Sequence, residues 1–142
     1  MKLKVAIASD HGGYRLKQFL QDTLDIKWID IGTYDDKKSV DYPDYGHALA
    51  AEVAAGNAEY GIAICGSGIG ISMACNRNPQ IRAALCTDVT MARLSREHND
   101  ANVLCLGERI MGTETALDIV KTFFETEFEG GRHKNRIAKL EV

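Results

Sequence analysis

The chain has 142 residues, 45% hydrophobic and 26% charged, a balance that suits one compact domain spanning residues 1–142. Its net charge of −3 leaves no basic excess, so we expect no nucleic-acid partner. No stretch approaches the roughly 20 apolar residues of a membrane span, and the start MKLKVAIASD lacks a signal-peptide cleavage pattern, so we expect no membrane partner.

The four cysteines show neither CxxC spacing nor the framework of a secreted disulfide protein. Cys75, Cys86 and Cys105 are predicted to be core residues, since a free cysteine in an apolar environment behaves as a small hydrophobe. We therefore predict a reduced, cytoplasmic protein.

Strands and helices are predicted to alternate along the chain. The expected strands are residues 5–9, 28–32, 61–65, 81–86 and 102–107. The expected helices follow Gly12-Gly13, Asp44 (as N-cap, with a stop at Gly56), the glycine loop after residue 65, Thr87-Asp88 and Thr113. This order is typical of an α/β domain with a parallel sheet. The tail EGGRHKNRIAKLEV begins with a glycine break, turns basic and is predicted to form an arm outside the sheet.

In such a sheet, ligands bind beyond the carboxyl ends of the strands. Asp10 and His11 follow the first predicted strand, Cys65 and the loop CGSGIG end the third, and Arg109 follows the fifth. We therefore expect the chemistry at this edge.

The loop CGSGIG has the spacing G-x-G-x-G, which is not a dinucleotide fingerprint. Its glycines would let backbone N–H groups approach an anion, with a helix beginning behind them. The alternative is a tight turn without a ligand. The same donors would stabilise a thiolate at Cys65, which could act as nucleophile or base; the alternative is a buried cysteine at the end of a strand.

Three further groups are weaker candidates. Asp10 and His11 suit proton transfer or phosphate binding, or they form a solvated turn; we expect no metal, since no other ligand set has a recognisable spacing. His98 ends a predicted helix, where a histidine is often only a dipole partner. Arg132 and Arg136 would lie one helical turn apart and could hold a phosphate dianion, or the tail is merely basic. Together these features favour a small phosphorylated substrate with no cofactor.

Several stretches jointly resemble the type B ribose-5-phosphate isomerases, whose family includes the galactose-6-phosphate isomerase subunits. The matching stretches are ASDHGG, DYPDYG, ICGSGIGISMACN, LSREHNDANVLCLGER and FEGGRHKNR. The resemblance implies a Rossmann-like three-layer sandwich with a five-stranded parallel sheet, a homodimer (paired into tetramers in some members) and aldose–ketose isomerisation of a sugar phosphate without a cofactor. The retained EHND and GGRH-x-x-R motifs favour the pentose phosphate branch.

The resemblance also implies a role for each matching residue. Cys65 corresponds to the catalytic base, and His98 to the acid that helps to open the sugar ring, paired here with Asp10. The loop that holds the enediolate is formed by Gly66, Ser67, Gly68, Ile69 and Gly70. Ser67, where threonine is frequent, could relay a proton. The substrate and phosphate contacts correspond to Asp10, His11, Asn99, Arg109, Arg132 and Arg136.

Two other functions stay open: isomerisation of a six-carbon sugar phosphate such as allose 6-phosphate, and a sensor that binds sugar phosphate without turnover. The topology adds an expectation about assembly. His98 should lie near the amino ends of the strands and Cys65 at their carboxyl ends, so the two would meet only across a subunit boundary, in a dimer with shared active sites.

Overall fold

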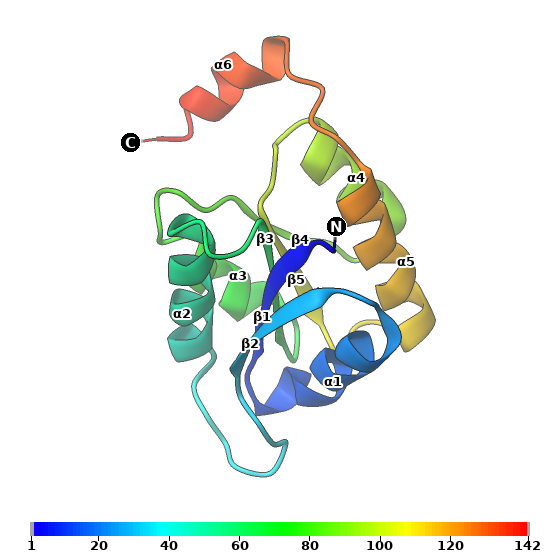
Figure 1. Cartoon of the computed structure of the whole chain (residues 1–142). Coiled ribbons are helices and arrows are strands. Elements are labelled where there is room, and N and C mark those ends of the chain that lie inside the picture. The colour runs from blue at the N-terminus through cyan, green and yellow to red at the C-terminus, as the bar shows by residue number, and fades with distance from the viewer. Residues whose placement is uncertain (1, 142) are drawn as a thin grey trace.

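The computed structural model describes residues 2–141 and contains a five-stranded parallel sheet in the order β2-β1-β3-β5-β4 (Figure 1). The strands are β1 Lys4–Ser9, β2 Lys27–Gly32, β3 Tyr60–Cys65, β4 Ala83–Leu85 and β5 Val103–Gly107. The helices are η1 His11–Gly13, α1 Tyr14–Thr23, α2 Tyr42–Ala54, α3 Ile69–Cys75, α4 Val89–Glu97, α5 Thr113–Glu125 and α6 Arg132–Ala138. All five predicted strands are confirmed.

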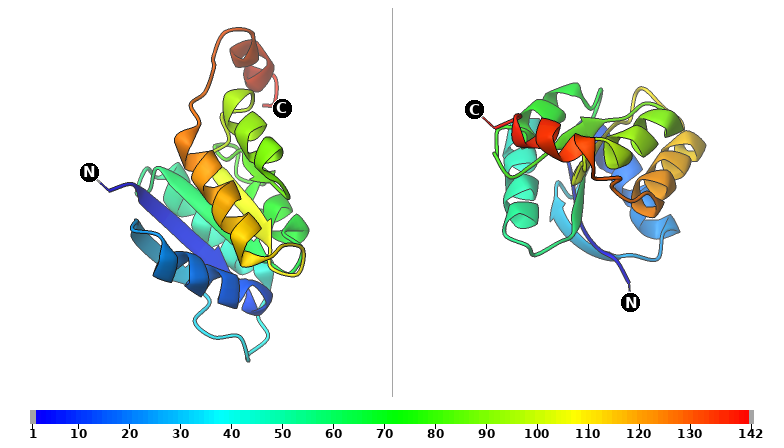
Figure 2. Two further views of the ribbon diagram at one scale, coloured as in Figure 1. Left: turned by 90° about the vertical axis from the view of Figure 1, so that its right-hand side faces the viewer. Right: turned by 90° about the horizontal axis from the view of Figure 1, so that it is seen from above.

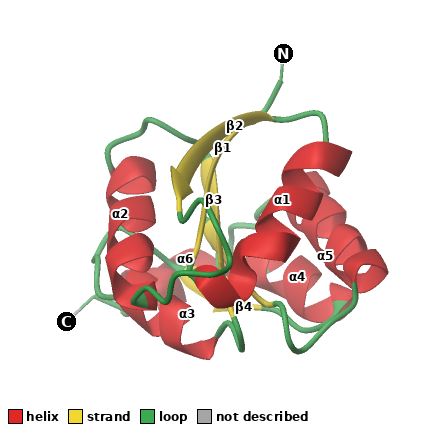
Figure 3. Cartoon of the chain, turned by 90° about the horizontal axis from the view of Figure 1, so that it is seen from below, coloured by secondary structure: helices red, strands yellow, loops and turns green. Residues whose placement is uncertain are grey.

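Helices cover both faces of the sheet, which confirms the predicted Rossmann-like three-layer sandwich (Figure 3). Because side chains alternate along a strand, Val5 and Ile7 of β1 pack towards α1, α4 and α5, whereas Ala6 and Ala8 pack towards α2 and α3. Cys65 belongs to the second cluster. The small residues on that face of β1 let α2 and α3 lie close behind the predicted site.

Two predicted boundaries were wrong. The second predicted helix begins at Tyr42 with Asp41 in the N-cap position, so Asp44 lies in the first turn and is not the cap. Pro43 explains the earlier start, because its fixed φ suits the first helical turn. β4 is shorter than 81–86, since the Ile81 N–H donates to the Asn78 carbonyl in a turn before the strand. The Asp88 cap is confirmed: its carboxylate accepts the Met91 N–H at 2.7 Å.

The basic tail forms α6, a short helix that stands outside the sandwich (Figures 1 and 2). Its lead-in is tied to the end of α4, where the Glu129 N–H donates to the Glu97 carbonyl at 3.1 Å. The predicted arm is thus confirmed, with Arg132 and Arg136 one turn apart on a helix.

Within residues 2–141, no helix combines the length and the apolar character that a membrane crossing requires.

Candidate active site

The order in which the chain adds strands to the sheet reverses between the adjacent strands β1 and β3. The helix after β1 packs on one face and the helix after β2 on the other, which opens a crevice at the carboxyl ends of these strands. Asp10 follows β1 and Cys65 ends β3, and the Asp10 N–H donates to the Ile64 carbonyl at 3.3 Å. The fold therefore brings the two predicted residues to one place.

The glycine loop after Cys65 surrounds the thiol with backbone donors. The Gly68 N–H donates to Cys65 Sγ at 3.2 Å, and the Ile69 N–H donates to Ser67 Oγ at 3.1 Å. Among the described residues, the amides of Gly66 and Ser67 have no acceptor, so they are available to a ligand oxygen. The Cys65 side chain is buried, with 5% of the residue exposed. One loop thus holds the sulfur and presents free donors beside it.

Close backbone packing fixes the shape of this loop. Gly68 has φ +79°, and a Cβ atom there would lie 2.6 Å from the Leu85 side chain. A Cβ atom on Gly107, at the end of β5, would lie 2.5 Å from the Ser67 carbonyl. Since real Cβ contacts are longer than this, neither position has room for a side chain.

A hollow of about 320 Å³, here called the thiol hollow, opens above Cys65. Its walls are formed by Asp10, Tyr42, Cys65, Gly66, Ser67, Gly70, Arg109 and Ile110. The Arg109 N–H donates to the Gly66 carbonyl at 2.9 Å, and its side chain lies along Gly66. The thiol hollow therefore combines a thiol, a carboxylate, free amides and one guanidinium.

Asp10 and His11 are both fixed by the backbone. Asp10 is 8% exposed as a residue, and its carboxylate accepts the Gly13 N–H at 3.1 Å. His11 Nδ1 accepts the Val40 N–H at 3.1 Å, which places the proton of a neutral ring on Nε2. His11 does not line the thiol hollow itself but stands beside Asp10 at its edge.

A second group of predicted residues gathers where α4 meets the tail. His98 caps the carboxyl end of α4, and its ring stacks on His133 with centroids 4.4 Å apart and planes 18° from parallel. They border a hollow of about 240 Å³, here called the histidine hollow. Its walls are formed by His98, Asn99, His133, Arg136, Ile137 and Leu140. Arg132 is exposed and lines neither hollow.

The loop that carries His98 and Asn99 is held by two arginines that share Asp100. Arg96 Nη1 donates to Asp100 Oδ1 at 2.9 Å and to the Ala101 carbonyl at 2.6 Å. Arg82 Nε donates to the Asn99 carbonyl at 2.9 Å, and Arg82 Nη2 to the Asp100 carbonyl at 2.9 Å. Asp100 itself has φ +46°. These bonds position the two functional candidates at the end of α4.

The two hollows lie at opposite ends of the strands. β3 and β5 run parallel with Gly61 beside Val103 and Cys65 beside Gly107, and His98 precedes β5. At about 3.3 Å per residue, the length of β3 separates the two ends by roughly 15 Å. Cys65 and His98 of one chain therefore do not share a hollow, as the topology predicted.

Sequence reasoning missed three residues at these sites: Tyr42, Glu129 and His133. The Tyr42 ring lies so close to the glycine loop that a Cβ atom on Gly70 would be 2.6 Å from it. The motif DYPDYG could have indicated Tyr42, because this tyrosine directly precedes a proline at the start of a helix. His133 and Glu129 are four positions apart in the tail, with Glu129 before α6 and His133 on it, but their partner His98 is distant in sequence.

The other cysteines lie in the core, as predicted. Cys75, Cys86 and Cys105 are all buried. Burial raises the pKa of the Cys86 thiol to about 11, although a hydrogen bond with Ser95 works against this rise. The pKa of Cys105 is also raised, through its interaction with Cys75 and through burial. At neutral pH these two thiols are protonated and not nucleophilic.

Comparison with known proteins places this geometry in a family. Residues 5–140 match the profile of the ribose/galactose isomerase family. A putative sugar phosphate isomerase of Bacillus subtilis is 48% identical, covering 97% of this chain and 95% of that protein. The solved structure of Clostridium thermocellum ribose-5-phosphate isomerase B is 53% identical, with a TM-score of 0.95 over 97% of this chain and 95% of that one.

A third comparison includes a ligand. The structure of Mycoplasma genitalium ribose-5-phosphate isomerase B with bound ribulose-5-phosphate is 39% identical, with a TM-score of 0.90 over 99% of this chain and 95% of that one. The chain therefore belongs to the ribose/galactose isomerase family, which confirms the family predicted from its motifs.

Proposed function

We propose that the chain is an aldose–ketose isomerase that interconverts ribose 5-phosphate and ribulose 5-phosphate without a cofactor. The observation that carries this proposal is the Cys65 thiol beside the free amides of Gly66 and Ser67. Relatives named ribose-5-phosphate isomerase B, aligned over nearly the whole chain, support the choice of substrate.

The proton transfer begins on the open-chain aldose. The Cys65 thiolate removes the proton from C2, the electrons move to the carbonyl oxygen on C1, and a C1–C2 double bond forms. The amides of Gly66 and Ser67 donate to the oxygen that gains charge. A proton then passes from the C2 hydroxyl oxygen to the C1 oxygen, with the Ser67 hydroxyl as relay. Cys65 returns its proton to C1, which leaves a carbonyl on C2 and the ketose.

Ring opening precedes this step, because the aldose is mostly a closed furanose in water. We assign it to His98, which donates a proton to the ring oxygen, and to Asp10, which removes the proton of the anomeric hydroxyl. Within one chain these residues face different hollows. The pairing therefore requires a second copy, so we propose a homodimer in which the histidine hollow of one chain faces the thiol hollow of the other. Pairing of dimers into tetramers remains an expectation.

The arginines would hold the phosphate at this shared site. Arg136 lines the histidine hollow and Arg109 the thiol hollow, so the two meet only if the hollows face each other. Arg132, one turn before Arg136, is assigned a weaker phosphate contact because it lines neither hollow. Asn99 and His11 are assigned to the sugar hydroxyls and to the phosphate at the rims.

An isomerase assay on ribose 5-phosphate with a chelator present tests the proposal. We expect full turnover, since no step uses a metal ion. A higher kcat/KM on allose 6-phosphate than on ribose 5-phosphate would replace the substrate by a six-carbon sugar. Binding of ribose 5-phosphate without any isomerisation would leave a non-catalytic sensor.

A further inference from the structure

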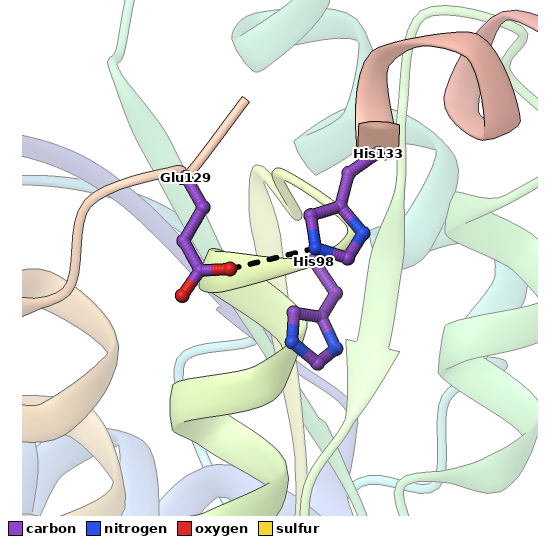
Figure 4. Close-up of side chains that lie close together, drawn as sticks. All are labelled: His98, Glu129 and His133. Carbon is purple, nitrogen blue, oxygen red and sulfur yellow. Dashed lines mark ion pairs between the residues drawn. The ribbon is translucent and has the colours of Figure 1, made fainter. Parts of the chain in front are cut away.

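Three potential metal ligands converge beside the histidine hollow, and the reaction proposed above uses only one of them. Figure 4 shows His98 at the end of α4, with Glu129 and His133 from the tail. Each offers a ligand atom within 4.8 Å of the other two. His133 Nε2 lies 3.4 Å from Glu129 Oε1, and the two residues are four positions apart in the sequence.

The buried nitrogen of His133 is the second observation. His133 is 4% exposed, and its Nε2 atom has no hydrogen-bond partner among the described residues. Buried polar atoms in folded proteins nearly always form a hydrogen bond, and the 3.4 Å contact of this nitrogen with Glu129 Oε1 does not meet that geometry, so the nitrogen is free to bind a ligand. An imidazole nitrogen beside a carboxylate is a donor pair that binds Zn²⁺ well.

We propose that His98, Glu129 and His133 form a binding site for a divalent transition-metal ion such as Zn²⁺. Two imidazoles and one carboxylate are a known zinc ligand set, in which the fourth position is left to water. In tetrahedral coordination with bonds of 2.0–2.1 Å, ligand atoms stand about 3.3 Å apart. The Glu129–His133 pair is already at 3.4 Å, and no pair has to approach by more than about 1.5 Å.

Two features set the conditions for binding. The stacked rings of His98 and His133 are nearly parallel, so their in-plane lone pairs do not meet at one point, and one ring has to turn. His98 is the ring that turns, because it is partly exposed whereas His133 is buried. Arg136 lines the same hollow, and its charge opposes any cation. Because only the Glu129 carboxylate among the three ligands offsets this positive charge, we expect its loss to weaken metal binding most.

The ion would act as an inhibitor. This part of the inference rests on the proposed function, in which His98 opens the sugar ring. A His98 nitrogen bound to Zn²⁺ cannot donate a proton to the ring oxygen, so metal and sugar phosphate would compete for the histidine hollow.

Zn²⁺ titration of the full-length Cys65→Ala protein tests the site apart from activity, since the variant has no thiol in the thiol hollow. We expect one Zn²⁺ per chain by calorimetry. Glu129→Gln and His133→Asn should each weaken binding at least about tenfold, as loss of a ligand should cost no less than loss of an outer-shell partner. His47→Gln is the matched control, because His47 is exposed on α2 and outside the cluster. Equal affinity in the parent and Glu129→Gln proteins, or an equal loss in His47→Gln, would overturn the site.

The activity measurement separates the site from its inhibitory effect. Zn²⁺ should inhibit the isomerase with Cys65 intact, a chelator should reverse this, and Glu129→Gln should require at least about tenfold more Zn²⁺ for the same inhibition. If Glu129→Gln weakens binding but leaves the inhibition unchanged, the site stands and its competition with substrate is wrong. If the protein shows no isomerase activity, the titration still decides whether the site exists.

Discussion

The two hollows are formed by different parts of the fold: the thiol hollow by strand ends and a glycine loop, and the histidine hollow by the end of α4 and the tail. In the thiol hollow, glycines and free loop amides lie beside side chains, of which Asp10 and Cys65 accept main-chain hydrogen bonds. The histidine hollow consists of side chains on a helix end and on an arm outside the sandwich. Proton transfer at carbon needs donors that do not move, whereas ring opening and phosphate binding need groups that can close on a bulky sugar. In the function proposed above, the thiol hollow carries the proton transfer, and the histidine hollow carries ring opening and phosphate binding.

Cys65→Ala gives the strongest test of the thiol hollow. We expect kcat to fall by about 10²–10⁴-fold, the usual contribution of one proton-transfer group. Solvent deuterium incorporation at C1 of ribulose 5-phosphate should fall equally, because it reports the same proton transfer. The melting temperature checks that the fold remains. More than about a tenth of wild-type kcat would show that Cys65 is not the only base.

His98→Asn should separate the two regions chemically. Isomerisation of ribose 5-phosphate should fall by about 10²-fold, because ring opening loses its acid. Ribulose 5-phosphate has no ring to open, so its deuterium exchange at C1 should stay within a factor of about three. Mass spectrometry of recovered ribulose 5-phosphate measures the exchange. Equal loss in both reactions would place His98 in the proton transfer itself.

Arg136→Ala compares two arginines on one helix. We expect KM to rise about tenfold with little change in kcat, because phosphate is held alike before and during the reaction. Arg132→Ala is the matched control and should have a smaller effect, since Arg132 lines neither hollow. Steady-state kinetics on ribose 5-phosphate measures both. An unchanged KM in both variants would contradict phosphate binding by the tail, which would then be only a basic surface.

Mixing inactive variants tests whether the hollows meet across a subunit boundary. When Cys65→Ala and His98→Asn chains exchange, half of the dimers are mixed, and each mixed dimer has one intact and one doubly altered site. Activity should return to about a quarter of wild type. If mass spectrometry shows mixed dimers but activity stays at background, each site belongs to a single chain.

Cys86→Ala should leave activity nearly unchanged, lower stability by a pH-independent amount through lost core packing, and remove the pH-dependent change in stability above pH 9. The folded-state pKa of Cys86 is raised from the ordinary 9.0 to about 11, so the unfolded chain loses this proton first as pH rises. The stabilisation that the protonated Cys86 thiol gives the folded state is fully present below pH 9 and is lost between pH 9 and 11, by about 3 kcal/mol in all. Urea unfolding at pH 8 and pH 10.5 measures the free energy. An identical pH dependence in both proteins would contradict this assignment.

Features that depend on residues close together in the sequence could be predicted from it. Apolar runs predicted all five strands, and the rule that ligands bind at carboxyl ends brought Asp10 and Cys65 together. The start of α2 was misplaced because Pro43 outweighed the capping signal of Asp44. The stacking of His98 on His133 could not be predicted from neighbouring residues in the sequence, because it depends on how the tail folds back onto the end of α4.

The packing around Gly68 and Gly107 bears on how such an enzyme could acquire a new substrate. These positions admit no side chain, so inherited changes there would damage the loop before they could reshape it. The rim offers more room for variation, because Tyr42 and Ile110 are exposed there. A lineage that moved from five-carbon to six-carbon sugars would therefore record the change in its rim residues, while the glycines around the thiol stayed the same.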